Sequence, residues 1–206
     1  MHRRLFLILL LLLPGIVLHA QEAAPVKTLK ARSISFQIDQ PIPEIFAHSV
    51  AATPDARGIP VTVKSYLNHE FERIPMNGEK LVFTTSSERS SIGDPKQIIA
   101  KATVHTNVRS AVLMFLPGDD KPGAPNYRVL TIEDTTNSFP RGSFKVINLS
   151  PLTLRITLEK SAYEFKKGET RIIKNPPVNA RNASAMSAYS FLDNHWQGIG
   201  ATSWPH

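Results

Sequence analysis

The sequence predicts an all-β protein, an antiparallel sandwich of Ig-like or barrel-like type with room for two β lobes. Short apolar segments recur roughly every 8–15 residues between clusters of Pro, Gly, Asn and Asp. No segment beyond residue 20 repeats apolar residues at the 3.6-residue spacing of an amphipathic helix. The chain has 16 prolines, which punctuate strands and exclude long helices. We expect less than about a tenth of the chain to be helical, against the usual third.

The first twenty residues have the layout of a secretory signal peptide. Arg3 and Arg4 precede an unbroken apolar run over residues 5–13, a Pro-Gly pair breaks the run, and Ala20 is small. The apolar stretch is shorter than the about 20 residues that a membrane span needs. We expect cleavage after Ala20, with an uncleaved N-terminal anchor as the alternative. The predicted organisation is a signal peptide at 1–20, a flexible lead-in at 21–32 and a β-sandwich region at 33–206.

The chain contains no cysteine, which excludes disulfides, thiolate metal sites and a cysteine nucleophile. Together with the export signal, this favours the bacterial periplasm or exterior. The formal charge of +7 falls to +5 when Arg3 and Arg4 leave, and the basic residues are scattered. We therefore expect a solvated basic surface and no nucleic-acid partner. No segment after the signal peptide is predicted to cross a membrane.

The first half of the remaining chain reads as a series of strands. Apolar residues at 34, 36 and 38 alternate with polar ones, and further strands are predicted over 44–51, 59–67, 71–76, 80–85 and 97–105. Asn77-Gly78 separates two of these segments and predicts a type I′ hairpin turn. Residues 111–116 are apolar at every position, which is typical of a strand buried on both faces.

The second half follows an exposed loop or linker at 117–126, where two lobes would divide. Strands are predicted over 127–135, 144–149 and 170–174. The clearest alternation runs over 152–158, with Leu and Ile on one face. Residues 180–187 are ambiguous between helix and strand. We expect 186–192 and 197–204 to form a final hairpin around residues 193–195. A faint similarity between 45–78 and 144–168 raises the possibility of an internal duplication.

Residues 127–174 carry three short motifs that look familiar. They are Phe-Pro-Arg-Gly-Ser at 139–143, Asn-Leu-Ser at 148–150 and Lys-Gly-Glu at 167–169. In this order the chain resembles an uncharacterised family of exported bacterial β-rich proteins. The resemblance implies an exported β protein and carries over no catalytic residue.

The reactive side chains form no recognisable catalytic or metal pattern. The histidines lack the i, i+4 and H-x-H spacings of metal sites, and no G-x-S-x-G nucleophile motif occurs. Asp119-Asp120 lacks the alternating ligand spacing of a Ca²⁺ loop. Glu133 and Asp134 are adjacent, so a strand would point them to opposite faces. We expect no catalytic site, no metal and no cofactor.

The remaining candidates are aromatic. Tyr163, Trp196 and Trp204 would bind a partner if they are exposed on a β surface, and would otherwise fill the core. The leading hypothesis is a non-enzymatic binding or structural protein whose partner is an unknown protein or glycan of the cell envelope. The alternatives are a carbohydrate-binding module and, with less support, a hydrolase. Binding is expected at a strand edge or an aromatic surface.

Overall fold

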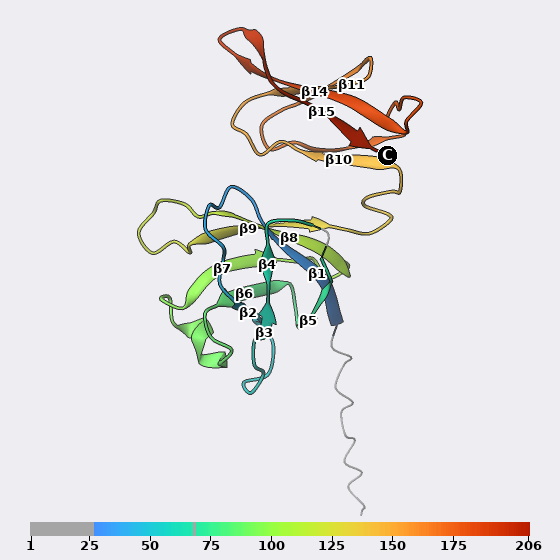
Figure 1. Ribbon diagram of the computed structural model, residues 1–206. Helices are drawn as coiled ribbons and strands as arrows, with labels where there is room; N and C mark the ends of the chain where they lie inside the picture. Colours follow the sequence, from blue (N-terminus) through green and yellow to red (C-terminus); the bar gives the residue numbers. More distant parts are fainter. Residues whose placement is uncertain (1–26, 68) are drawn as a thin grey trace, which may run out of the picture.

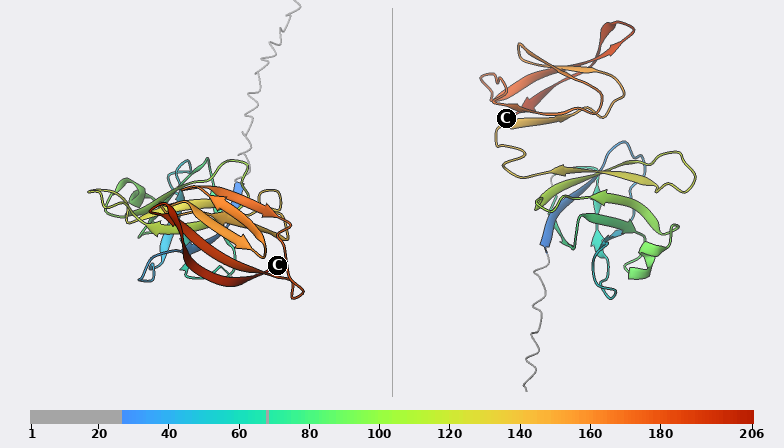
Figure 2. Two further views of the ribbon diagram at one scale, coloured as in Figure 1. Left: turned by 90° about the horizontal axis from the view of Figure 1, so that it is seen from above. Right: turned by 180° about the vertical axis from the view of Figure 1, so that it is seen from behind.

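The computed structural model describes residues 27–67 and 69–206, and the regular secondary structure of this part of the chain is nearly all strand, which confirms the all-β prediction. Its one helical segment is a 3-10 turn, η1 (Arg89–Gly93). Figures 1 and 2 show two lobes, an N-terminal lobe from β1 to β9 and a C-terminal lobe from β10 to β15, joined through residues 134–142. The predicted signal peptide and residues 21–26 lie outside the described residues. Residues 27–32, expected as part of a flexible lead-in, belong to strand β1.

One sheet of the N-terminal lobe is built around its first strand. It contains β1 (Lys27–Ser35), β4 (Val63–Lys64), β5 (Glu72–Met76), β8 (Ser110–Pro117) and β9 (Tyr127–Glu133). β1 pairs in parallel with β4 and β8 and antiparallel with β5, so the expectation of a purely antiparallel sandwich was incomplete. Parallel neighbours need a long crossover, and here the intervening chain supplies it by forming the second sheet.

The second sheet of this lobe is antiparallel, in the order β3-β2-β6-β7. Its strands are β2 (Ile45–Ser49), β3 (Ile59–Val61), β6 (Lys80–Thr84) and β7 (Ile98–Thr103). The two sheets bury a shared apolar core in which Phe83 and Phe115 meet edge to face, with ring centroids 5.1 Å apart. The lobe is therefore a sandwich stabilised by apolar burial and without disulfides.

Two local predictions in this lobe were wrong. Asn77-Gly78 joins β5 to β6, but β5 pairs with β1 and β6 pairs with β2 and β7, so the turn connects two sheets and not the arms of a hairpin. Gly78 adopts a positive φ of 80°, and the backbone of Asn77 is bonded to the hydroxyl of Ser49, which fixes the change of sheet. The segment 59–67 splits into β3 and β4, which also belong to different sheets.

The strand over 111–116 is buried as predicted, with only Met114 half-exposed. The Pro- and Gly-rich segment 117–126 connects β8 to β9, which pair antiparallel from Ala111–Glu133 to Pro117–Tyr127. It is a hairpin loop within one sheet, so it does not coincide with the junction between the lobes.

The C-terminal lobe packs two sheets against a small core. One sheet pairs β10 (Ser143–Ile147) with β13 (Thr170–Lys174), and the other has the order β12-β11-β14-β15. Its strands are β11 (Leu154–Leu158), β12 (Ser161–Phe165), β14 (Ala183–Leu192) and β15 (His195–Pro205). Four buried apolar residues form its core: Ile156, Leu158, Phe165 and Ile173.

The end of the chain forms the hairpin that the sequence predicts. β14 and β15 pair antiparallel around Asp193 and Asn194, which both have positive φ, as a type I′ turn requires. The ambiguous segment 180–187 contributes to strand β14 and forms no helix.

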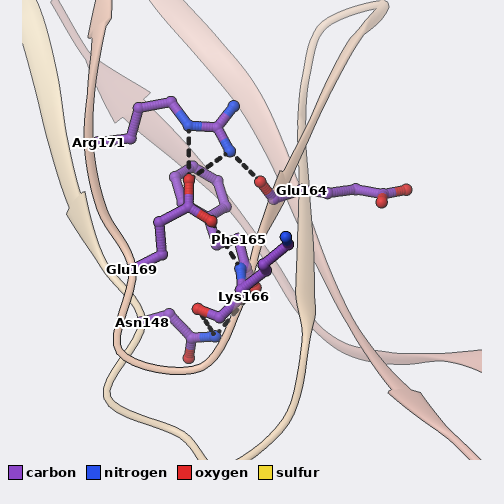
Figure 3. A network of polar contacts seen from close by, with 6 residues as sticks. All are labelled: Asn148, Glu164, Phe165, Lys166, Glu169 and Arg171. Carbon is purple, nitrogen blue, oxygen red and sulfur yellow. Dashed lines mark hydrogen bonds and ion pairs between the residues drawn. The ribbon is translucent and has the colours of Figure 1, made fainter.

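The polar side chain of Asn148 holds the C-terminal lobe together at one end. It is buried, and its amide donates to the carbonyls of Leu152, Phe165 and Lys166 at 2.8, 3.1 and 3.0 Å. Its carbonyl accepts from the backbone N–H and hydroxyl of Ser150. We call these contacts of Asn148 with Ser150, Leu152, Phe165 and Lys166 the Asn148 clasp, and Figure 3 shows the part that involves Phe165 and Lys166. The Asn-Leu-Ser motif thus has a structural role.

Candidate functional site

Strand β15 is the longest edge strand of the C-terminal lobe. It has eleven residues, pairs with β14 on one side, and lies at the end of its sheet. Over the described residues no other strand pairs with its second side. In the left view of Figure 2 it borders the lobe as the dark red strand. An edge strand presents a row of backbone donors and acceptors to a further strand.

Hydrogen bonds on the far side of β14 show which groups of β15 point outward. The backbone of Ala185 in β14 bonds to Glu159, on the side away from β15. Ser203, which lies opposite Ala185, therefore belongs to a non-hydrogen-bonded pair and directs its N–H and C=O away from β14. The same alternation places the backbone groups of four residues on the open edge: Trp196, Gly198, Ala201 and Ser203. None of these groups is bonded to another part of the described chain.

The open edge carries no protecting charge. No Asp, Glu, Lys or Arg occurs from Trp196 to Pro205, and the side chain of Ile199 is 56% exposed. Natural sheets usually guard their edges with Lys, with Pro or with short strands. On β15 the devices of this kind are Pro205, at its last position, and a bulge opposite Ala188 and Tyr189.

The opposite edge of the same sheet, β12, is guarded. It has five residues, and the guanidinium of Arg171 donates to the outward carbonyl of Glu164 and to the carboxylate of Glu169 (Figure 3). That carboxylate accepts the N–H of Lys166 at 2.8 Å, and Asn148 donates to the Lys166 carbonyl. The hydrogen bond from Lys166, aided by Arg171, holds the pKa of Glu169 below its ordinary value. Side chains thus occupy the Glu164 carbonyl and both backbone groups of Lys166, at the end of this edge.

An aromatic cluster adjoins the open edge on the outer face of the sheet. The rings of Phe191 and Trp196 lie 5.1 Å apart, and the guanidinium of Arg155 lies 3.9 Å from the centroid of the Trp196 ring. Arg155 is also bonded to Glu164 at 2.6 Å. Phe191, Trp196 and Arg155 thus pack against one another on the outer face, next to the first half of β15.

The three aromatic residues proposed from the sequence separate in the structure. Trp196 lies on the outer face beside the open edge. Trp204 and Tyr163 are half-buried and pack against the apolar core, with the Trp204 ring 5.0 Å from that of Phe144. Only Trp196 is therefore placed to contact a partner on the outer face of this sheet.

The titratable groups of the described residues do not converge on a catalytic arrangement. No group of three or more His, Asp or Glu side chains with metal-site geometry occurs among them. His48 is fully buried, with Nε2 2.9 Å from the Thr84 hydroxyl and 3.1 Å from the Ser86 carbonyl. Burial, supported by the nearby Arg89, lowers the pKa of His48 against the opposing effect of the Ser86 carbonyl. Its neighbour Ser91 is also buried, so the two side chains have almost no contact with solvent.

Comparison with known proteins gives no relative: no family model, no curated protein and no solved structure matches the chain. Among the described residues there is no helix with the length and apolar character to cross a membrane.

Proposed function

We propose that this is an exported binding protein that captures an extended segment of another polypeptide by adding it as a strand to β15. The observation that carries the proposal is the contrast between the two edges of one sheet. β12 is short, and side chains bond to its outward Glu164 carbonyl and to both backbone groups of the following Lys166, whereas β15 is long and uncharged with its outward groups unbonded. Exposed edges of this kind recruit partners through main-chain hydrogen bonds.

The chemistry of the edge defines the kind of segment that it would accept. The backbone groups of Ala201 and Ser203 supply hydrogen bonds to any sequence, so they give affinity and little specificity. Specificity would come from side chains on the outer face, where Trp196 and Phe191 offer apolar contact. A charged segment would gain no ion pair along β15, since no charged residue occurs from 196 to 205. We expect an uncharged, β-prone partner segment.

The structure gives less support to carbohydrate binding. Sugar rings stack on an open aromatic face, and Arg155 already lies over the Trp196 ring at 3.9 Å. Trp204, the other candidate, packs in the core. The protein-binding hypothesis therefore explains more of the observed surface.

A proline at an outward position tests the proposal. Ser203→Pro removes an outward N–H while leaving the hydrogen bonds between β14 and β15 in place, and Pro205 already occupies an equivalent position. Ala162→Pro is the matched control, because Ala162 faces outward on the guarded edge β12. A photo-reactive side chain at Ala201 would crosslink the partner in an envelope extract. We expect Ser203→Pro to abolish the crosslink and Ala162→Pro to preserve it.

Hydrogen exchange distinguishes strand addition from other contacts. In the free protein, the amides of Ala201 and Ser203 should exchange quickly, and those of Thr202 and Trp204, which face β14, should be protected. Addition of the crosslinked partner, once purified, should protect Ala201 and Ser203. A partner that binds without protecting these two amides would refute strand addition.

The exported location has its own test. The intact mass of protein recovered from the periplasm or medium should correspond to a chain that begins near Gln21. A mass that retains residues 1–20 would contradict the predicted cleavage.

A further inference from the structure

A groove of about 450 Å³ lies between the two lobes, on the side of the first sheet that faces away from the core of the N-terminal lobe. Strand β10 of the C-terminal lobe lies over β8 and β9 in Figure 1. Nine of the thirteen lining residues are apolar: Ile34, Phe36, Leu67, Val112, Met114, Ile132, Phe139, Ile147 and Leu149. The volume is within the range of small-molecule sites.

The lobes leave this apolar surface partly uncovered. Adjacent strands contribute the floor, where Ile34 in β1 lies beside Met114 in β8. At the rim, Phe36, Leu67, Phe139 and Leu149 are 37–45% exposed, so four of the eleven exposed large apolar residues that the structure describes gather here. An exposed apolar concavity of this kind is typical of a ligand-binding groove.

Arg32 provides a preformed anion contact in the groove. Its guanidinium lies 3.8 Å from the centroid of the Phe71 ring, and its Nε donates to the carbonyl of His69 at 2.9 Å, so its orientation is fixed. Its two terminal nitrogens have no acceptor, and no carboxylate lies within ion-pair distance, among the residues that the structure describes. A guanidinium in this state matches the two oxygens of a carboxylate.

The other cation that lines the groove is already engaged. Lys145 donates to the backbone carbonyl of Glu133 at 2.7 Å, and its Nζ lies 5.7 Å from the centroid of the Phe139 ring. Arg32, whose terminal nitrogens have no acceptor among the described residues, is therefore the cation best placed to hold an anion.

We propose that the groove binds a single fatty-acyl chain whose carboxylate is held by Arg32. The acyl chain would lie on the apolar floor between the lobes. A peptide suits the site less well, because β1, β8 and β9 present their faces to the groove and use their backbone groups in pairing with each other. An acyl chain needs no backbone partner, and apolar burial provides its affinity.

The test measures palmitate and hexadecanol binding below their aggregation concentrations, by displacement of the fluorescent fatty acid cis-parinarate. We expect one palmitate per chain, with Arg32→Gln weakening palmitate binding about tenfold or more and leaving hexadecanol binding unchanged. Arg32→Lys should restore part of the affinity, since it keeps the charge and loses the planar fork. Arg73→Gln, which removes an exposed cation from β5 in the same sheet, should have no effect.

Two further variants test the location. Met114→Trp fills the floor and should abolish binding of both ligands. Leu149→Asp, at an exposed rim position, should weaken palmitate binding, and it tests the location if Met114→Trp does not fold. Circular dichroism confirms folding in each case. The proposal is refuted by absence of saturable palmitate binding, by equal affinity in Arg32→Gln, or by an apolar peptide that competes with palmitate at lower concentration.

Discussion

Replacement of Asn148 with Ala should destabilise the C-terminal lobe by about 3 kcal/mol. Leaving a buried carbonyl or N–H without a partner costs roughly 1–3 kcal/mol. The substitution removes the donor from three carbonyls and the acceptor from Ser150. The carbonyl of Phe165 keeps its place in the ladder with β11, and the carbonyl of Leu152 still accepts from the Ser150 hydroxyl, so the penalties do not all apply in full.

This loss is large for so small a unit. A lobe of about 60 residues has a total stability of roughly 3–9 kcal/mol, and its core cluster contains only four buried apolar residues. The melting temperature should therefore fall by about 10–20 °C. The hydrogen bonds of Asn148 therefore contribute a large share of the free energy of unfolding of this lobe.

Tryptophan fluorescence reports this change selectively, because both tryptophans of the chain, Trp196 and Trp204, belong to the C-terminal lobe. Urea unfolding followed by fluorescence should show the lower midpoint for Asn148→Ala, and Asn126→Ala, on an exposed loop, should match the parent chain. A shift of less than about 1 kcal/mol would show that solvent replaces the lost hydrogen bonds and that the clasp is dispensable.

Three further results are expected. Burial lowers the pKa of His48 in the folded state, so the contribution of neutral His48 to stability is complete above the unfolded pKa of about 6.5 and is lost as the pH falls below that value. The urea midpoint of the N-terminal lobe, followed by circular dichroism, should therefore drop between pH 7.5 and 5. A midpoint that does not change with pH contradicts this prediction. Gly58→Ala should lower the melting temperature because its Cβ would lie 2.6 Å from the His48 ring, whereas Gly93→Ala, with open space around it, should not. Trp204→Ala should destabilise the C-terminal lobe more than Trp196→Ala, since only the former removes a core contact, and the reverse order in a thermal scan would contradict the assignment.

Local sequence signals predict the strands better than they predict the pairing of those strands. The alternation over 152–158 identifies β11 and its buried face, because one strand is enough to set a period of two. The Asn77-Gly78 dipeptide fails as a hairpin signal, because β5 finds its partner in β1, where Leu29 and Ile74 are both fully buried. The choice between two partners depends on the burial that each sheet offers, and a local motif carries no such information.

The two tryptophans show why the site could be predicted only in part. Trp196 and Trp204 are eight residues apart, so strict alternation would place both on one face of β15. A bulge opposite Ala188 and Tyr189 inserts one extra residue and reverses the order of faces, which leaves Trp196 outside and Trp204 in the core. The uncharged stretch 196–205 was readable in the sequence, but its position at an open edge depends on the topology of the sheet.

The central place of β1 determines the order in which the N-terminal lobe can assemble. Lys30 pairs with Ser110, eighty residues further along the chain, so the first sheet cannot close until most of the lobe is present. Contacts so distant in sequence slow folding, because the entropy of closing the loop is lost before the pairing is gained. The β14–β15 hairpin, by contrast, forms from neighbouring residues. Refolding should therefore show a fast phase in tryptophan emission, from the C-terminal hairpin, and a slower phase in the far-ultraviolet signal of the N-terminal lobe.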